Sequence, residues 1–335
     1  MMKNRSWSLK GTDVTLIVIS ILGYLALTAY SRGDFLSSNS IRTFLAFLAV
    51  PVLIGLAQMV ALCVGQLNLA VGALGGFLAC LMAVLMVDFG MPMPLALVLG
   101  VVAGAVVGAV TGLIIVATKI NGFIVTLATM TVLMGAQFKL VGTRTVSGYS
   151  ETLKTYGSAT VGPIPLIFVL ALVVAAITAW FFARTVAGRR LLASGGNPVA
   201  ARLSGISNDR SVVVAHSLSG LIIGVAAVVS VASLPGTNAS VGADWMLPSF
   251  AAPIIGGVAL AGGGVAVLGT VLAAFIVRLV DSARALLSLD PSVVNFVIGA
   301  VVLGTVITAN VRANRAASQA ASEQRASASA KEAAK

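Results

Sequence analysis

Apolar runs of close to twenty residues recur along almost the whole chain, and short polar segments separate them. A helix needs about 20 apolar residues to cross the roughly 30 Å hydrocarbon core of a bilayer. Only 9% of the 335 residues are charged, whereas soluble domains carry about 25%. We therefore predict an all-α fold, a polytopic transmembrane helical bundle of about ten spans. The spans are expected at 13–30, 43–64, 69–87, 94–117, 122–141, 163–183, 212–232, 249–262, 265–284 and 293–310.

The expected eighth span, 249–262, is too short to cross a membrane by itself. Glycines crowd the stretch from Gly256 to Gly269, which favours broken or re-entrant helices in this part of the chain. Non-helical backbone at membrane depth is tolerated only where protein or a water-filled cavity surrounds it. Glycine accounts for 35 of the 335 residues, and small residues allow close helix–helix contact in lipid.

The distribution of charge predicts which span ends face the cytoplasm. With the N-terminus inside and ten crossings, 14 of the 21 basic residues but only 4 of the 10 acidic residues fall on the cytoplasmic side. Cytoplasmic loops carry an excess of lysine and arginine, so both termini and the loop 184–210 are expected to be cytoplasmic. The net charge of +11 then reflects topology rather than nucleic-acid binding. The predicted parts are a cytoplasmic segment 1–12, a transmembrane domain 13–310 and a low-complexity cytoplasmic tail 311–335.

The sequence offers little chemistry for catalysis. It has no Walker A motif, so this chain is not expected to hydrolyse ATP. The only histidine, His216, is interpreted as an interfacial or interhelical hydrogen-bonding residue more readily than as a proton relay. Cys63 and Cys80 lie in apolar segments without metal-ligand spacing. We expect no enzyme activity, no catalytic residue, no metal and no cofactor on this chain.

One polar run interrupts the apolar pattern between the expected second and third spans. In Gly65-Gln-Leu-Asn-Leu-Ala-Val-Gly72, the carboxamides of Gln66 and Asn68 stand at a span junction. They can line a pathway through the membrane, or Asn68 can act as the N-cap of the third span. The N-cap is the slightly favoured interpretation.

A second polar run, Asn121-Gly-Phe-Ile-Val-Thr-Leu-Ala-Thr-Met130, begins the expected fifth span. Thr126 and Thr129 are three residues apart and share a helix face. They can bond to a neighbouring helix or to a hydroxylated solute, and packing is the favoured role.

Two further polar groups have structural interpretations. Trp245 lies in a polar loop and is expected to anchor the chain at a membrane edge. Arg278, Asp281 and Arg284 follow one side of a helix at intervals of three residues, which predicts ion pairs along its outer end.

The longest polar interruption, 184–210, is the strongest indication of a partner. It carries five arginines against one acid, Asp209. A Gly-Gly-Asn-Pro turn at 195–198 is expected to open a short helix, and its residues 199–203 are apolar except for Arg202. A short amphipathic helix of this kind can fill a groove on a partner protein. The competing interpretation is an ordinary solvated loop with the positive charge of a cytoplasmic face.

Three runs resemble, in the same order, segments of the ribose-type sugar ABC transporter permeases. The loop from Gly188 to Ile206 resembles the cytoplasmic loop of that family. Phe123-Ile-Val-Thr-Leu-Ala-Thr-Met130 is similar to its PFIVTLGTM segment, and 251–263 is similar to its AIAAVVIGGTSLxGG segment. The span at 219–226 also fits, and the likeness runs from about residue 43 to 310.

The resemblance implies the membrane-spanning permease subunit of an ATP-driven ABC importer in a bacterial cytoplasmic (inner) membrane. Such a permease moves a monosaccharide or related polyol by alternating access. The implied partners are cytoplasmic ABC ATPase subunits that bind ATP and Mg²⁺, a periplasmic or extracellular solute-binding protein, and a second copy or a paralogous permease. No nucleic acid is expected.

In that family the cytoplasmic loop carries a coupling helix that docks on the ATPase. Carried onto this sequence, the expected ATPase-coupling residues are Gly195, Gly196, Asn197, Ala200, Ala201, Leu203, Ser204 and Gly205. The candidates for the solute pathway are Gln66, Asn68, Thr126 and Thr129.

Charges of the family pattern are missing here at three places. Gln66 and Asn68 stand in the run that usually reads GGIDLSVG, Met134 replaces the usual arginine, and 245–250 lacks the usual acidic residues. These departures leave the sugar open and are compatible with a heterodimeric permease. The sequence is also compatible with an ABC permease for a branched-chain amino acid or nucleoside. A secondary carrier or channel that works without ATP is a less favoured interpretation.

Overall fold

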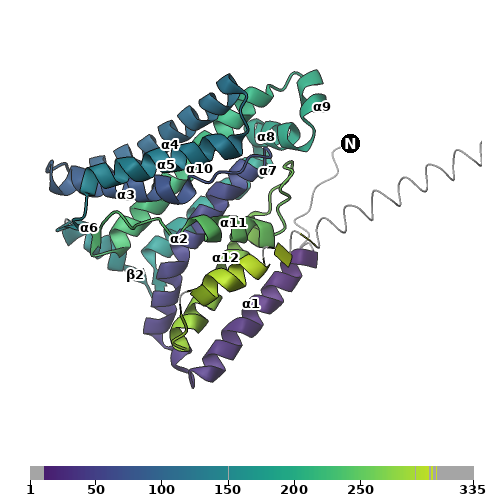
Figure 1. Ribbon diagram of the computed structural model, residues 1–335. Coiled ribbons are helices and arrows are strands. Elements are labelled where there is room, and N and C mark those ends of the chain that lie inside the picture. Colours follow the sequence, from purple (N-terminus) through teal and green to yellow (C-terminus); the bar gives the residue numbers. More distant parts are fainter. Residues whose placement is uncertain (1–10, 150, 291, 302, 305–306, 308–335) are drawn as a thin grey trace, which may run out of the picture.

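The computed structural model describes residues 11–149, 151–290, 292–301, 303–304 and 307, and helices dominate it (Figure 1). Most of the predicted segment 1–12 and the whole predicted tail 311–335 lie outside the described residues. The helices are α1 (Gly11–Tyr30), η1 (Asp34–Leu36), α2 (Ser38–Leu62), α3 (Val71–Val87), α4 (Met93–Thr118), α5 (Gly122–Val141), α6 (Glu151–Ser158), α7 (Leu166–Arg184), α8 (Val186–Gly196), α9 (Pro198–Leu203), α10 (Asn208–Ser233), α11 (Met246–Ile255) and α12 (Val267–Leu286). A further apolar helix covers Ser292–Val301.

Six helices of the described chain are long and apolar enough to cross a membrane, namely α1, α2, α4, α5, α7 and α10. Three more apolar helices are shorter: α3, α11 and Ser292–Val301. Each predicted span overlaps one of these helices or α12, which has 20 residues and three charges in its second half. The predicted all-α multi-pass bundle is confirmed.

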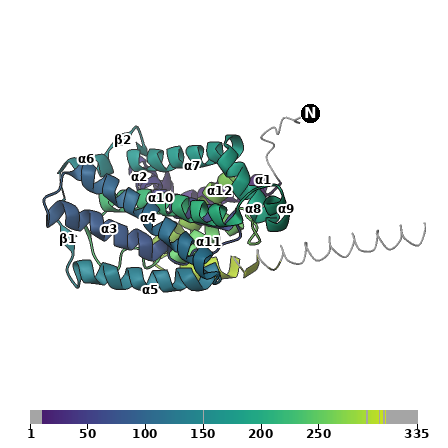
Figure 2. The same cartoon turned by 90° about the horizontal axis from the view of Figure 1, so that it is seen from above.

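The two ends of the bundle differ. Figure 2 shows α8 and α9 at one end and α6, β1 and β2 at the other, and we call these the α9 end and the α6 end. At the α6 end, β1 (Val146–Ser147) pairs antiparallel with β4 (Gly236–Thr237), and β2 (Thr160–Val161) pairs antiparallel with β3 (Ile164–Pro165). The pair of β1 and β4 joins loops that are distant in the sequence.

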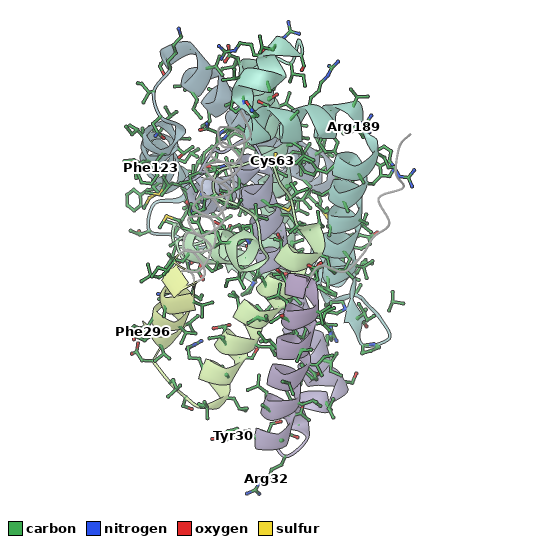
Figure 3. The ribbon with its side chains drawn as sticks, turned by 90° about the vertical axis from the view of Figure 1, so that its right-hand side faces the viewer. Tyr30, Arg32, Cys63, Phe123, Arg189 and Phe296 are labelled. Carbon is green, nitrogen blue, oxygen red and sulfur yellow. The ribbon has the colours of Figure 1, made fainter. Side chains whose placement is uncertain are left out.

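Helix α2 forms the centre of the bundle. It is buried from Val52 to Leu62 and packs against α10, α12, α11 and α7. A helix that is apolar on every face is typical of a buried position. The apolar residues from Val52 to Leu62 therefore suit the centre of the bundle. Figure 3 accordingly shows Cys63, just beyond the end of α2, inside the bundle and Arg189 of α8 toward its edge.

Helices α4 and α10 run antiparallel and touch backbone to backbone along a row of glycines. A Cβ atom on Gly104 would overlap the carbonyl oxygen of Gly220, and a Cβ on Gly220 would overlap that of Gly104. Gly108 and Gly112 continue the row one and two turns further along α4. In lipid the hydrophobic effect does not press helices together, so close van der Waals contact between small residues holds such a pair.

Two irregular segments, 63–70 and 256–266, meet near the α9 end. The backbone N–H of Gly263 donates to the carbonyl of Cys63 at 2.8 Å, which joins them directly. The break that the glycines of 256–269 predict is present, since α11 ends at Ile255 and α12 begins at Val267. The segment 63–70 is mostly buried or half-buried, whereas Gly257 and residues 259–261 are exposed.

Trp245, which is predicted to anchor the chain at a membrane edge, packs its ring against the bundle. Its ring packs on α3 at Gly75, where an added Cβ would overlap the indole. The loop before α11 folds back onto α3, with Gly242 against Gly72. The half-buried tryptophan therefore packs against the core, and its role at a membrane edge stays a prediction.

Two other predictions for polar side chains have different outcomes. The ion pairs of Asp281 with Arg278 and Arg284 are present. The guanidinium of Arg278 also lies 4.9 Å from the centroid of the Phe47 ring. The predicted hydrogen bond of His216 is not found, because within the described part of the chain neither ring nitrogen has a partner. His216 is a buried residue of α10, and its carbonyl oxygen and Cβ face Gly108 and Gly112 of α4.

Candidate coupling surface and solute pathway

The segment 184–210 folds into two short helices joined at one asparagine. Thr185 caps α8, because its hydroxyl oxygen accepts the N–H of Gly188 at 3.0 Å. Asn197 ends α8 in extended backbone and caps α9, its side-chain oxygen accepting the N–H of Ala200 at 3.0 Å. Gly195 and Gly196 thus form the last turn of α8 instead of the predicted turn before α9. The helix break is at Asn197 alone.

Helix α9 is fixed to the bundle by the first turn of α10. The amide nitrogen of Asn208 donates to the carbonyl of Pro198 at 2.8 Å, and the hydroxyl of Ser194 donates to the Asn208 side-chain oxygen at 2.9 Å. After α9, the hydroxyl of Ser204 donates to the carbonyl of Ala200 at 2.9 Å, and Gly205 turns the chain with a φ of 76°. A six-residue helix would not hold its position in water without such contacts.

The outward face of α9 is apolar. Val199 is 71% exposed and Leu203 is 86% exposed, while Ala201 is buried against the bundle. Ala200 and Arg202 are also exposed. Because α9 lies at the end of the bundle rather than along its sides (Figure 2), this small apolar surface bordered by arginine suits a groove on a partner protein.

Three side chains satisfy the backbone of the irregular segment 63–70. The carboxamide of Gln58 is oriented so that its nitrogen and its oxygen both have partners. The nitrogen donates to the backbone carbonyl of Asn68 at 2.9 Å, and the oxygen accepts the backbone N–H of Asn68 at 3.2 Å. The hydroxyl of Thr126 donates to the carbonyl of Leu67 at 3.2 Å. The Asn68 side chain accepts the N–H of Ala70 at 3.1 Å. In the membrane interior each of these backbone groups would otherwise lack a partner.

Replacing Gln58 by leucine should therefore destabilise the bundle. The N–H and C=O of Asn68 would both lose their partner, at a cost of about 1–3 kcal/mol for an unsatisfied buried group. Thermal unfolding of the purified protein in detergent measures this. The matched control is Gln66→Leu, which removes a carboxamide only half-buried at a pocket. Equal melting temperatures for the two variants would contradict the structural role of Gln58.

The structure brings three of the four predicted pathway residues, Gln66, Asn68 and Thr126, to one place. Asn68 and Thr126 each bond to a backbone group of 63–70, and the Asn68 amide also donates to the hydroxyl of Ser219 at 3.4 Å. The prediction that Asn68 is the N-cap of the third span is wrong, because α3 begins at Val71 and its N-cap is Ala70. Thr129 lies one turn further along α5, half-buried, and its hydroxyl donates to the carbonyl of Val125 at 2.9 Å.

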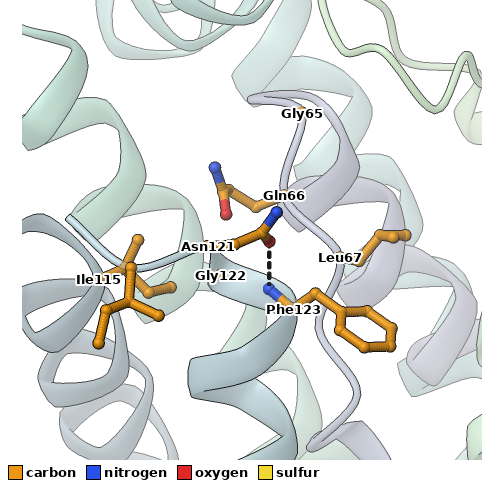
Figure 4. A pocket seen from close by; sticks show the side chains of 8 residues that line it. Gly65, Gln66, Leu67, Ile115, Asn121, Gly122 and Phe123 are labelled. Atoms are coloured by element: carbon orange, nitrogen blue, oxygen red, sulfur yellow. Dashed lines mark hydrogen bonds between the residues drawn. The ribbon is translucent and has the colours of Figure 1, made fainter.

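A polar pocket of about 450 Å³ opens where the 63–70 segment meets the start of α5 (Figure 4). Gln66 lies so close to α5 that a Cβ on Gly122 would overlap its side-chain oxygen. The Asn121 side-chain oxygen accepts the N–H of Phe123 at 2.9 Å, which leaves its amide nitrogen available. The described lining carries no charged side chain; it consists of Gly65, Gln66, Leu67, Ile115, Ile120, Asn121, Gly122 and Phe123.

Two contributors to this region are absent from the predicted pathway residues. Gln58 is the only polar side chain in the run 44–62, and a lone carboxamide in an apolar helix is itself a signal of an interior contact. Asn121 begins the polar run 121–130 but gave no sign of facing Gln66, because their segments are far apart in sequence. Among the described residues, no group of three His, Cys, Asp or Glu side chains could hold a metal ion.

The long apolar helices define a multi-pass membrane protein. The sequence matches the family described as branched-chain amino acid transport system / permease component over residues 40–306, and the chain belongs to this family. It is thus a permease component of a transport system. No solved structure matches the chain.

Curated relatives of similar length support the same assignment. The ribose import permease protein RbsC of Haemophilus influenzae is 27% identical over 81% of this chain and 85% of its own length. The D-allose transport system permease protein AlsC of Escherichia coli is 29% identical over 90% of this chain and 91% of its own length. The autoinducer 2 import system permease protein LsrC of Escherichia coli is 24% identical over 86% and 84%. The predicted relationship to ribose-type ABC permeases is confirmed.

Proposed function

We propose that this permease is the membrane-spanning subunit of an ATP-driven importer for a monosaccharide or related polyol in a bacterial inner membrane. The observation that carries the proposal is the uncharged pocket beside Gln66, whose amide and backbone groups suit hydroxyl groups. Its volume of about 450 Å³ falls in the range of small-molecule sites. The ribose and D-allose named for two relatives are solutes of this chemical class.

A branched-chain amino acid is the competing solute, and it appears in the description of the family. An amino acid carries a carboxylate and an ammonium group, and burying either without a partner is costly. Neither charge finds an opposite charge among the residues that line the pocket. A neutral hydroxylated solute therefore fits this lining better.

ATP hydrolysis belongs to a separate ABC ATPase in this proposal, and that ATPase docks on α9. The exposed Val199 and Leu203 supply the apolar contact, and Arg202 supplies charge at its border. ATP and Mg²⁺ bind the ATPase, and this chain contributes no catalytic residue. The energy of ATP binding can drive transport only if the ATPase contacts differ between two states of the permease.

The proposed topology has the α9 end in the cytoplasm, ten crossings and both termini cytoplasmic. The 184–210 segment at that end carries five arginines, which agrees with the excess of basic residues in cytoplasmic loops. Helix α3 completes its crossing through 63–70, and α11 completes its crossing through 256–266. A solute-binding protein would then dock at the α6 end, and a second copy or a paralogous permease would complete the pathway for alternating access.

Uptake of radiolabelled ribose or allose into proteoliposomes that contain the purified complex tests the solute class. We expect uptake to need ATP and to be competed by unlabelled pentoses or hexoses but not by leucine. Uptake of leucine that sugars do not compete would overturn the sugar assignment. Sugar uptake that persists without ATP would instead favour a secondary carrier.

The variant Gln66→Leu should weaken sugar uptake while leaving the fold intact. Loss of one neutral hydrogen bond to the solute costs about 0.5–1.5 kcal/mol, which corresponds to roughly a two- to tenfold decrease in uptake rate at low solute concentration. The melting temperature should stay at the wild-type value, because the Gln66 side chain supports no backbone group in the way Gln58 does. Unchanged sugar uptake would remove Gln66 from the pathway.

A further inference from the structure

Three backbone segments meet without intervening side chains near the α9 end. They are the last turn of α8, the end of α2 and the irregular segment 256–266. The carbonyl oxygen of Cys63 accepts the N–H of Gly263 at 2.8 Å. A Cβ on Gly195 would overlap that same oxygen and lie 2.7 Å from the nitrogen of Gly263. We call Gly195, Cys63 and Gly263 the backbone junction.

Neighbouring glycines extend the backbone junction on both sides. A Cβ on Gly262 would lie 2.7 Å from the nitrogen of Gly65 and 3.0 Å from the carbonyl oxygen of Gly195. Gly65, Gly262 and Gly263 have φ angles of 72°, 91° and 80°, which side-chain-bearing residues rarely adopt. Backbone atoms in contact cannot relieve a displacement by changing rotamer, as side chains can. A shift of α8 must therefore move 63–65 or break the contact.

The backbone junction lies between the exposed face of α9 and the polar pocket. On one side, Gly195 is two residues from Asn197, which caps α9. On the other side, Cys63 is three residues from Gln66, which lines the pocket. The contacts thus run without a gap from the exposed face of α9 to the wall of the pocket, and each step is a covalent link, a backbone contact or a hydrogen bond.

We propose that the backbone junction relays ATPase-driven movement of α8 and α9 to the segment 63–67, and so changes access to the pocket from the α9 end. Gly195 and Gly263 are positioning residues in this relay, since they touch neither ATP nor solute. The inference rests on the proposed function, because it needs an ATPase on α9.

Adjacent glycines supply a matched pair of variants. Gly195→Ala would force a methyl group into the carbonyl of Cys63, whereas the Cβ of Gly196→Ala would lie 3.5 Å from the Cα of Gly263, an ordinary contact. Gly264→Ala is a second control, because nothing lies within 4 Å of its added Cβ. All three substitutions add one methyl group to a glycine, so a difference among them reports the contact of residue 195 with the carbonyl of Cys63.

The readout is the rate at which a water-soluble maleimide labels Ile120→Cys in the assembled complex, with and without ATP and vanadate. Ile120 lines the pocket and is exposed, whereas the native Cys63 and Cys80 are buried. We expect ATP to change the labelling rate in the parent, in Gly196→Ala and in Gly264→Ala. In Gly195→Ala the complex should still bind the ATPase and hydrolyse ATP, but the nucleotide response should be lost together with uptake.

A normal nucleotide response in Gly195→Ala, or its equal loss in both controls, would overturn the relay. If Gly195→Ala fails to fold, hydrogen–deuterium exchange on the wild-type complex tests the relay instead. The relay requires ATP to change exchange in peptides that cover both 61–67 and 256–266, and an unchanged 61–67 peptide would refute it. Failure of the parent to bind any ATPase would overturn the proposed function itself, which is a distinct result.

Discussion

Replacing Gly104 by leucine should prevent the protein from reaching its folded state. The Cβ of residue 104 would overlap the carbonyl oxygen of Gly220 on the facing helix, and backbone atoms cannot move aside as a side chain can. Overpacking against flexible side chains already costs about 1–3 kcal/mol, and here two helices of 26 residues must separate. Because folded proteins are stable by only about 5–15 kcal/mol, we expect little monodisperse protein from membranes.

The matched control for this variant is Gly135→Leu. Gly135 lies on the exposed side of α5, and nothing lies within 4 Å of its added Cβ. Fluorescence-detected gel filtration of tagged protein, followed by thermal unfolding of what elutes as a single peak, compares the two. A Gly104→Leu protein with the elution profile and melting temperature of Gly135→Leu would contradict the backbone contact between α4 and α10.

Replacing Leu203 by glutamate should abolish binding of the ATPase without altering the fold. Leu203 is 86% exposed, so a charge there costs the free permease nothing. In a docked interface the same charge would be buried without a partner, and an anchor residue of this kind carries about 2–4 kcal/mol, or roughly a 30- to 900-fold loss of affinity. Co-purification of the ATPase and solute-stimulated ATP hydrolysis should both be lost.

A similarly exposed valine at the opposite end provides the control. Val161 is 68% exposed in β2 at the α6 end, so Val161→Glu should leave ATPase binding unchanged. Substitutions at Gly195 or Ala201 are poorer tests of docking, because both residues are buried against the bundle. Wild-type ATPase binding by Leu203→Glu would show that α9 is not the docking element.

Most of the helices could be predicted from sequence, because the chain is apolar and its polar breaks are few. The predicted span 122–141 coincides with α5, and 94–117 differs from α4 by one residue at each end. The glycines of 256–269 correctly indicated irregular backbone between α11 and α12. The end of α8 could not be predicted, since Gly195 and Gly196 favour a turn by composition. They are helical in the structure, and the close approach of Cys63 and Gly263 explains why residue 195 has no side chain.

The candidate site was predictable only in part, because its residues act through contacts between distant segments. Asn68 and Thr126 stand out in the sequence as polar residues in apolar runs, yet their hydrogen bonds go to protein groups. The same criterion applied to Gln58 would have found the third member of this group. Pairing Gln66 with Gly122 requires knowledge of how α5 packs, and no local pattern contains it. Trp245 illustrates the same limit, since its loop position gave no sign of the contact with Gly75.

The identity of the partner at α9 is the most direct test of the account. A photoreactive amino acid at position 203 should be crosslinked in cells of the native host, and the captured chain should be identified by mass spectrometry. We predict that this chain is an ATPase with a P-loop, and that the same photoreactive group at position 161 does not capture it. No ATPase at position 203, with efficient crosslinking to other proteins, would contradict an ATP-driven permease coupled through α9.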